Sequence, residues 1–175
     1  LEGVPGVGFI LVRKSVLQNS KNNSHSLSLD LYDQWESMEK NAQWRFTPPT
    51  HVLAAFNQAL IEHLKEGGIK GRFKRYKNNC KIICDGMAKL GFKQLLSNDL
   101  QAPIIITFLQ PKVPNFDFKK FYNILSDKGF LIYPGKLTVA DTFRIGCIGY
   151  LNENDMKEAI LAVEKTLKDM DIKLN

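Results

Sequence analysis

The sequence is poor in the residues that build metal centres and nucleophilic active sites. Its 175 residues include three cysteines and three histidines, no two histidines have the spacing of metal ligands, and neither CxxC nor HExxH occurs. No serine lies in a GxSxG turn, the usual anchor of a serine hydrolase. Cys80, Cys84 and Cys147 are odd in number and cannot all pair, so we expect buried, reduced thiols. The sequence therefore predicts no metal site.

Long apolar segments and phosphate-binding loops are also lacking. No apolar run reaches the ~18 residues of a membrane-spanning helix. The glycines from Gly3 to Gly8 lack the Lys-Ser/Thr pair of a P-loop, and they precede an apolar run, whereas a dinucleotide-binding loop follows a strand. Turn geometry accounts for these glycines. We expect a cytoplasmic protein without a membrane segment.

Acidic and basic residues are mixed along most of the chain, whose net charge is +6. The one dense basic segment runs from Lys70 to Lys77. A solvated helix face is the favoured explanation of this segment, and phosphate binding is the alternative. A basic nucleic-acid-binding module is kept as a second hypothesis for the whole chain. The sequence has no aromatic-glycine signature of an RNA-recognition motif, so we expect no nucleic-acid partner.

Residues 1–50 are expected to be the tail of a larger α/β domain. The chain starts at Leu1 without a methionine, and a glycine-rich turn leads into an apolar run. This arrangement predicts a chain entered in mid-domain, with a buried strand over residues 8–13. A polar loop over residues 16–28 and a short helix within residues 27–41 are expected to follow.

Two helices over residues 51–90 are expected to connect this tail to a second domain. Two consecutive prolines forbid a helix before Thr50, which is well placed as an N-cap. Apolar residues then recur with helical periodicity over residues 51–66 and again over 69–90. Glycines follow both segments and end the helices.

Residues 91–175 are predicted to form a small α+β domain. Runs of β-branched and aromatic residues indicate strands over 104–109, 130–133 and 142–147, and helical periodicity indicates helices over 116–128 and 152–170, the latter with Asn152 as its N-cap. This order is typical of a small, mostly antiparallel sheet with flanking helices.

Two places in the sequence are candidates for binding an anion. The loop over residues 44–51 presents hydroxyls and amides just before a helix N-terminus, where a phosphate can be received, and a stiff loop with a capping threonine is the alternative. Arg144 lies among apolar neighbours in an expected strand, so its guanidinium needs an anionic partner. That partner is either structural or the carboxylate or phosphonate of a substrate.

Five segments, taken together and in order, resemble one enzyme family. They are residues 3–9 (GVPGVGF), 26–32 (SLSLDLY), 44–51 (WRFTPPTH), 132–136 (IYPGK) and 143–146 (FRIG). The set resembles the 2-aminoethylphosphonate–pyruvate transaminase family, in the class V branch of the fold-type I pyridoxal-phosphate-dependent aminotransferases. The resemblance covers nearly the whole chain and implies the C-terminal part of such an enzyme, ending in its small α+β domain.

The resemblance implies roles for particular residues. The lysine that binds pyridoxal 5′-phosphate as a Schiff base lies just upstream of the Gly-Val-Pro-Gly segment in the family, so it would fall before Leu1, and no catalytic residue is expected in this chain. Lys14 and Lys136 do not replace it. Thr47 matches the threonine that reaches the cofactor phosphate of the partner subunit in a homodimer. Arg144 matches the arginine that holds the anionic group of the substrate.

The reaction implied for the intact enzyme transfers an amino group from 2-aminoethylphosphonate to pyruvate. Its products are phosphonoacetaldehyde and L-alanine, which places it in phosphonate metabolism. The 175-residue chain alone is expected to be inactive because the lysine is missing. A sister aminotransferase acting on alanine or serine and glyoxylate is the alternative within the same fold. Pro48 stands where the family often has serine, and it preserves the stiffness of the loop.

Overall fold

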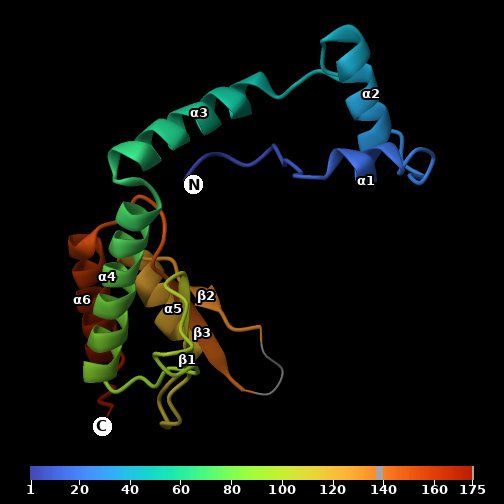
Figure 1. The fold of residues 1–175 in the computed structure, drawn as a ribbon. Coiled ribbons are helices and arrows are strands. Elements are labelled where there is room, and N and C mark those ends of the chain that lie inside the picture. The colour runs from blue at the N-terminus through green and yellow to red at the C-terminus, as the bar shows by residue number, and fades with distance from the viewer. Residues whose placement is uncertain (137–139, 175) are drawn as a thin grey trace. The chain divides into compact units, whose positions relative to one another are not determined.

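The chain divides into two units, which are described separately. The structure is a computed structural model and describes residues 1–136 and 140–174. The first unit is Leu1–Glu62 and the second is His63–Asn175 (Figure 1). Within the described residues, no helix combines the length and the apolar character needed to cross a membrane.

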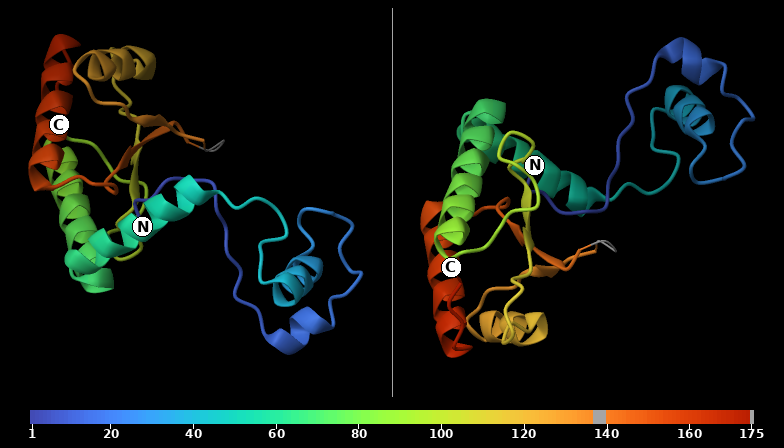
Figure 2. Two further views of the ribbon diagram at one scale, coloured as in Figure 1. Left: turned by 90° about the horizontal axis from the view of Figure 1, so that it is seen from above. Right: turned by 90° about the horizontal axis from the view of Figure 1, so that it is seen from below.

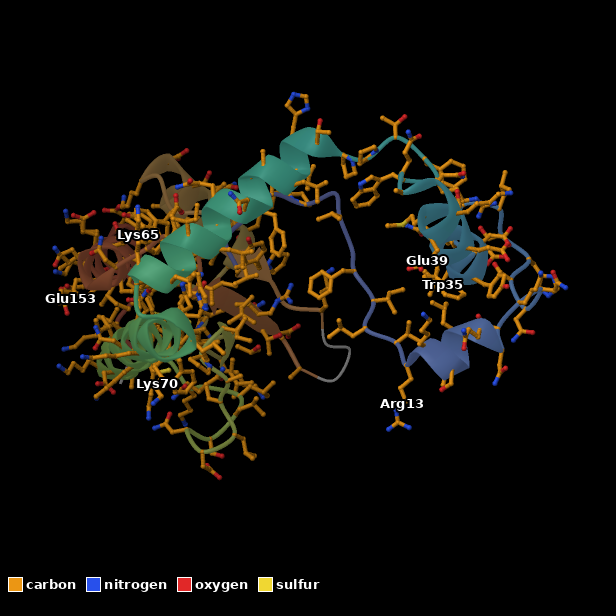
Figure 3. All side chains as sticks on the ribbon, turned by 45° about the horizontal axis from the view of Figure 1, so that its top comes forward. Arg13, Trp35, Glu39, Lys65, Lys70 and Glu153 are labelled. Atoms are coloured by element: carbon orange, nitrogen blue, oxygen red, sulfur yellow. The ribbon has the colours of Figure 1, made fainter. Side chains whose placement is uncertain are left out.

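The first unit is built from helices joined by extended segments. They are α1 (Lys14–Gln18), α2 (Leu31–Asn41) and most of α3 (Thr50–Lys65). The side chain of Asp30 caps α2 by accepting a hydrogen bond from the backbone N–H of Asp33 at 3.0 Å. Trp35 points from α2 toward α1 (Figure 3), and the Nζ atom of Lys14 lies 5.6 Å from the centre of its ring.

The strand expected over residues 8–13 is not formed, so that prediction is wrong. The side chains of Phe9, Ile10 and Leu11 are 73%, 61% and 92% exposed, and these residues pair with no other strand among those described. A strand requires a neighbour to which its backbone can hydrogen-bond. The apolar run indicates side chains suited to burial, but it does not specify what buries them. The loop expected over residues 16–28 is also shortened at its start by α1.

The helix α3 begins one residue earlier than the sequence indicates. Thr50 is its first helical residue rather than its N-cap, and the carbonyl oxygen of Pro49 accepts a hydrogen bond from the N–H of Leu53 at 3.0 Å. The helical periodicity is confirmed, although most of the apolar side chains on α3 remain partly exposed. Within the first unit, Ala59 is buried and the ring centre of Phe56 lies 6.4 Å from that of Phe9.

Glycines shape the turn into α4, which is Gly68–Lys89. Gly67 has a φ of 99°, a left-handed conformation that residues with a side chain rarely adopt. A Cβ atom on Gly71 would overlap the carbonyl oxygen of Glu66. The first turn of α4 can therefore lie against the preceding turn only because residue 71 is glycine.

Glu66 binds two arginines of α4. Its carboxylate accepts hydrogen bonds from the Nε atoms of Arg72 and Arg75, each at 2.6 Å. The Nη1 atom of Arg75 also donates to the carbonyl oxygens of Gly149 and Leu151, the latter at 3.1 Å. The hydrogen bonds from Arg75 and Arg72 lower the pKa of Glu66 from 4.5 to about 2. Glu66 and Arg75 thus tie the start of α4 to the segment before the last helix.

Replacing Glu66 by glutamine should destabilise the second unit by about 1–3 kcal/mol at pH 7. A pKa that falls from 4.5 to about 2 on folding contributes stability above pH 4.5, and this stability is lost as the pH falls toward 2. Each pKa unit corresponds to about 1.4 kcal/mol, and the 24% exposure of the Glu66 side chain reduces the total. Urea unfolding followed by far-UV circular dichroism measures the loss.

The matched control for this substitution is Glu158→Gln, because Glu158 is exposed on the last helix. The control should leave the free energy of unfolding within about 0.5 kcal/mol of the unsubstituted value. The stability difference between the Glu66 variant and the unsubstituted chain should shrink below pH 4.5. A Glu66 variant as stable as the control at pH 7 would contradict the account.

The second unit contains a three-stranded sheet with the order β1-β3-β2. β1 (Ile105–Leu109) and β3 (Thr142–Gly146) are antiparallel, with Thr107 opposite Arg144. β2 (Tyr133–Pro134) is antiparallel to β3, with Tyr133 opposite Arg144 on the other side. The predicted α+β class with a small antiparallel sheet is confirmed.

The strand β2 differs from its expected position. The sequence indicates residues 130–133, whereas only Tyr133 and Pro134 pair with β3. Pro134 has no N–H to donate to a neighbouring strand. It is tolerated here because β2 is an edge strand of the sheet.

Helices α4, α5 (Phe118–Asp127) and α6 (Glu153–Asp169) cover the buried face of this sheet. Figures 1 and 2 show α4 and α6 side by side on one side of the strands. The side chain of Asn152 caps α6 in a reciprocal capping box with Asp155, as the sequence predicts.

An aromatic cluster forms the centre of this core. Phe143 on β3 is fully buried, and its ring centre lies 5.5–6.0 Å from those of Phe92, Phe108, Phe118 and Phe121. Because alternate residues of a strand face opposite sides, burial of Phe143 and Ile145 places Arg144 on the outer face of the sheet. The core therefore fixes the direction of the candidate site residue.

Candidate functional site

Arg144 lies at the middle of β3, on the face of the sheet that the helices leave uncovered. It shares this face with Thr107 and Tyr133, which are its partners across the two neighbouring strands. Its Nε and Nη2 atoms donate hydrogen bonds to the carbonyl oxygen of Pro134 at 3.3 and 3.2 Å. The guanidinium carbon lies 5.9 Å from the ring centre of Tyr133. The strand, a carbonyl and a ring therefore hold the guanidinium in place.

The charge of Arg144 is not neutralised by a carboxylate in the part of the chain that the structure describes. Across residues 1–136 and 140–174, no acidic side chain pairs with it within 4.0 Å. The hydrogen bonds to Pro134 involve Nε and Nη2, and a guanidinium carries five N–H donors. The remaining donors can bind a carboxylate or a phosphonate oxygen. Of the two partners expected for Arg144, the structural carboxylate is therefore not present among these residues.

Thr47 lies in the exposed loop that precedes α3 in the first unit. Pro48 and Pro49 follow it, and the N–H of Thr50 donates to the carbonyl oxygen of Pro48 at 2.9 Å. The Thr47 hydroxyl is therefore presented on a stiff loop next to a helix N-terminus. Thr47 and Arg144 belong to different units, and each is described only within its own unit.

Arg45 holds this loop in place, and sequence reasoning assigned it no role. Its Nη1 atom donates to the carbonyl oxygen of Leu27 at 3.0 Å, and its Nη2 atom lies 3.4 Å from a carboxylate oxygen of Asp33. The guanidinium also lies 5.1 Å from the ring centre of Phe46. Because these partners are up to 18 residues away in sequence, no local pattern could have identified them.

Among the residues that the structure describes, no lysine has the setting of one that binds a carbonyl cofactor covalently. Such a lysine must lose its proton near neutral pH, which burial next to apolar or cationic groups promotes. All of the lysines are exposed except Lys128, which is half-buried and forms an ion pair with Asp169 at 2.7 Å. Lys14 and Lys136 are exposed, so neither has the buried setting of a cofactor-binding lysine. The chain's residues fit the anion-binding part of a cofactor site and not its covalent attachment.

The basic segment from Lys70 to Lys77 is partly structural. Arg72 and Arg75 bind Glu66, while Lys70 is exposed at the start of α4 (Figure 3). Within the described residues, no group of three or more metal-binding side chains is placed to hold a metal ion. The cysteines are free and buried, as expected.

Comparisons with known proteins identify the architecture. No family model matches the chain. The chain is 52% identical over 174 residues to 2-aminoethylphosphonate–pyruvate transaminase 1 of Cupriavidus pinatubonensis, covering 99% of this chain and 46% of that protein. It superposes on pyridoxamine-pyruvate aminotransferase of Mesorhizobium loti with a TM-score of 0.77 and 19% identity, covering 93% of this chain and 43% of that one. It also superposes on ureidoglycine-glyoxylate aminotransferase of Bacillus subtilis, with a TM-score of 0.76 and 19% identity. This superposition covers 92% of this chain and 42% of that one.

The fold is therefore that of part of a fold-type I pyridoxal-phosphate-dependent aminotransferase. In sequence, the chain is a relative of the 2-aminoethylphosphonate–pyruvate transaminases over 99% of its length, which confirms the resemblance. It spans about half the length of the curated relatives that it matches, 46% in the case of the Cupriavidus protein.

Proposed function

We propose that this chain supplies the substrate-anion site of a transaminase that converts 2-aminoethylphosphonate and pyruvate to phosphonoacetaldehyde and L-alanine. The observation that carries the proposal is the position of Arg144, whose guanidinium stands on the open face of the sheet without a carboxylate partner among the described residues. The proposed substrates each carry an anionic group, a phosphonate or a carboxylate. The name of the 52% identical relative contains both substrates.

In this proposal, Arg144 holds the phosphonate in one half-reaction and the carboxylate of pyruvate in the other. A guanidinium suits both groups because its planar fork of N–H donors can bind two oxygens at once. The carbonyl of Pro134 and the ring of Tyr133 restrict its side chain beforehand. Less conformational entropy is then lost when the substrate binds.

Thr47 is proposed to contact the phosphate of pyridoxal 5′-phosphate bound to the partner subunit of a homodimer. The exposed hydroxyl on a stiff loop supports this role. When bound, the cofactor supplies the electron sink for amino transfer. The chain contributes the groups that hold the anionic ends, and none of its lysines is assigned a proton transfer. We further propose that the intact enzyme is cytoplasmic and that the isolated chain is inactive.

A sister enzyme acting on alanine or serine and glyoxylate is the competing proposal. The fold does not separate the two, because the superposition on the ureidoglycine-glyoxylate enzyme is nearly as good as on the pyridoxamine-pyruvate enzyme. The sequence similarity favours aminoethylphosphonate, since the 52% identity to a protein of that name extends over 99% of this chain.

A hybrid enzyme tests which substrates the chain selects. The matching segment of the Cupriavidus transaminase, 174 residues long, is replaced by this chain. With added pyridoxal phosphate, the hybrid should convert aminoethylphosphonate and pyruvate at least about tenfold faster than alanine or serine and glyoxylate. A discrimination of this size corresponds to about 1.4 kcal/mol in the transition state. Faster turnover of the glyoxylate pairs would support the competing proposal instead.

A further inference from the structure

Three thiols meet in the second unit at a place that the proposed function does not use. Cys80 and Cys84 lie one turn apart on α4, and their Sγ atoms are 3.9 Å apart. Cys147 directly follows β3, and its S–H donates a hydrogen bond to the carbonyl oxygen of Ile104 at 3.4 Å. All three cysteines are free.

A pocket of about 430 Å³ opens onto two of these thiols. Its lining includes Cys80, Cys84, Lys77, Lys81, Phe73 and Pro103. The volume falls within the roughly 300–1,000 Å³ of small-molecule sites. Cys147 is not among the lining residues and is 0% exposed. A small reagent can therefore approach Cys80 or Cys84 without unfolding the unit.

Of the two buried cysteines that line the pocket, Cys80 is the better nucleophile. Its sulfur lies 3.9 Å from that of Cys84, whose S–H can donate to a thiolate. Interactions with the thiols of Cys147 and Cys84 lower the pKa of the Cys80 thiol. The interaction with Cys80, together with burial, raises the pKa of the Cys84 thiol. The thiolate is the reactive form of cysteine.

The charge at the pocket rim indicates which reagents are attracted. Lys77 and Lys81 contribute two positive charges. Asp85 offsets one of them, because it forms an ion pair with Lys81 at 2.5 Å. The rim therefore carries a net positive charge, next to the apolar surface of Phe73, which is 54% exposed.

We propose that Cys80 is a site of covalent modification by small anionic disulfides. The Cys80 thiolate attacks one sulfur of the disulfide R–S–S–R, a new S–S bond forms, and the old S–S bond breaks. R–S⁻ leaves with the electron pair of that bond. The disulfide reagent is the oxidant, Cys80 is oxidised, and the product is a mixed disulfide.

The mixed disulfide should persist, because Cys84 is poorly placed to displace it. Side chains four residues apart on a helix have Cβ atoms about 5–6 Å apart, whereas a disulfide requires about 3.5–4.5 Å. Forming a Cys80–Cys84 bond would therefore distort α4. The expected end product is one R–S group per chain, attached to Cys80.

The test uses 5,5′-dithiobis(2-nitrobenzoate), an anionic aromatic disulfide whose released thiolate absorbs visible light. The native chain should release one equivalent rapidly, and the denatured chain should release three, one for each cysteine. Peptide mass spectrometry should locate the rapid adduct on Cys80. Cys84→Ser is the matched control and should keep the rapid phase, whereas Cys80→Ala should remove it.

The role of the rim charge is tested with Lys77→Glu and a neutral disulfide. This charge reversal should slow the anionic reagent about three- to fivefold and leave the rate with 2,2′-dithiodipyridine unchanged. Adduct location in the unsubstituted chain answers the central question even if a cysteine variant does not fold. An adduct first found on Cys84 or Cys147, or three thiols that react together at a denaturant-dependent rate, would overturn the proposal.

Discussion

Replacing Arg144 by glutamine in the hybrid transaminase should lower kcat/KM for aminoethylphosphonate by about 10²- to 10³-fold. Each charge-assisted hydrogen bond contributes about 1.5–3 kcal/mol, and loss of two such bonds to the phosphonate, each at the lower end of this range, removes about 3–4 kcal/mol of transition-state stabilisation. Pyruvate should lose affinity as well, because the same guanidinium is proposed to bind its carboxylate. Steady-state kinetics with each substrate varied in turn measures both effects.

The position of Arg144 makes this variant interpretable. It lies on the uncovered face of the sheet and its described hydrogen bonds go only to the carbonyl of Pro134, so glutamine should leave the fold intact. The Arg144→Lys variant retains the positive charge but lacks the planar set of N–H donors of a guanidinium. It should therefore be more active than the glutamine variant and less active than the unsubstituted hybrid. Unchanged kcat/KM in the glutamine variant would remove Arg144 from the substrate site.

Replacing Phe143 by alanine should destabilise the second unit by about 3–5 kcal/mol. Phe143 is fully buried, and four aromatic rings surround its own within 6.0 Å. Truncation leaves a cavity that these rings can fill only in part. Because a domain is stable by about 5–15 kcal/mol, such a loss should lower the urea midpoint strongly.

The matched control is Tyr133→Ala, an aromatic residue in the neighbouring strand that is 55% exposed. It should cost less than about 1.5 kcal/mol, since little apolar surface is withdrawn from water there. Far-UV circular dichroism is the suitable probe, because both tryptophans, Trp35 and Trp44, lie in the first unit. A Phe143 variant no less stable than the Tyr133 variant would contradict the described core.

The second unit could largely be predicted from the sequence because the apolar side chains that define its helices and strands pack against one another in its core. Helical periodicity places α4 and α6 within about one residue of their observed ends. The runs of β-branched and aromatic residues around Ile106 and Phe143 predict β1 and β3. The strand β2 differs most, since edge strands tolerate proline and pairing with β3 decides its length.

The apolar run at residues 8–13 could not be predicted in the same way. Its pattern is that of a buried strand, yet Leu11 is 92% exposed. The hydrophobic pattern indicates which side chains are stabilised by burial, whereas a strand also needs a neighbouring strand to which its backbone can hydrogen-bond. That neighbour is not among the described residues, so the local pattern alone gave the wrong structure.

The candidate site shows the same division between local and long-range information. Arg144 could be identified from the sequence because a charge among apolar strand residues is unusual. The roles of Arg45 and Glu66 could not, since their partners depend on the fold: Arg45 bonds to Leu27, and Arg75, which holds Glu66, bonds to Leu151. Thr47 depends on family resemblance, and its contact with a cofactor phosphate stays a prediction.

Formation of alanine from aminoethylphosphonate and pyruvate, with added pyridoxal phosphate, tests the central claim most directly. The isolated 175-residue chain and the hybrid are assayed side by side. We predict activity in the hybrid and none in the isolated chain, whose lysines all lack the buried setting that a cofactor-binding lysine needs. Turnover by the isolated chain, or a folded hybrid that forms no alanine from these substrates, would contradict the account.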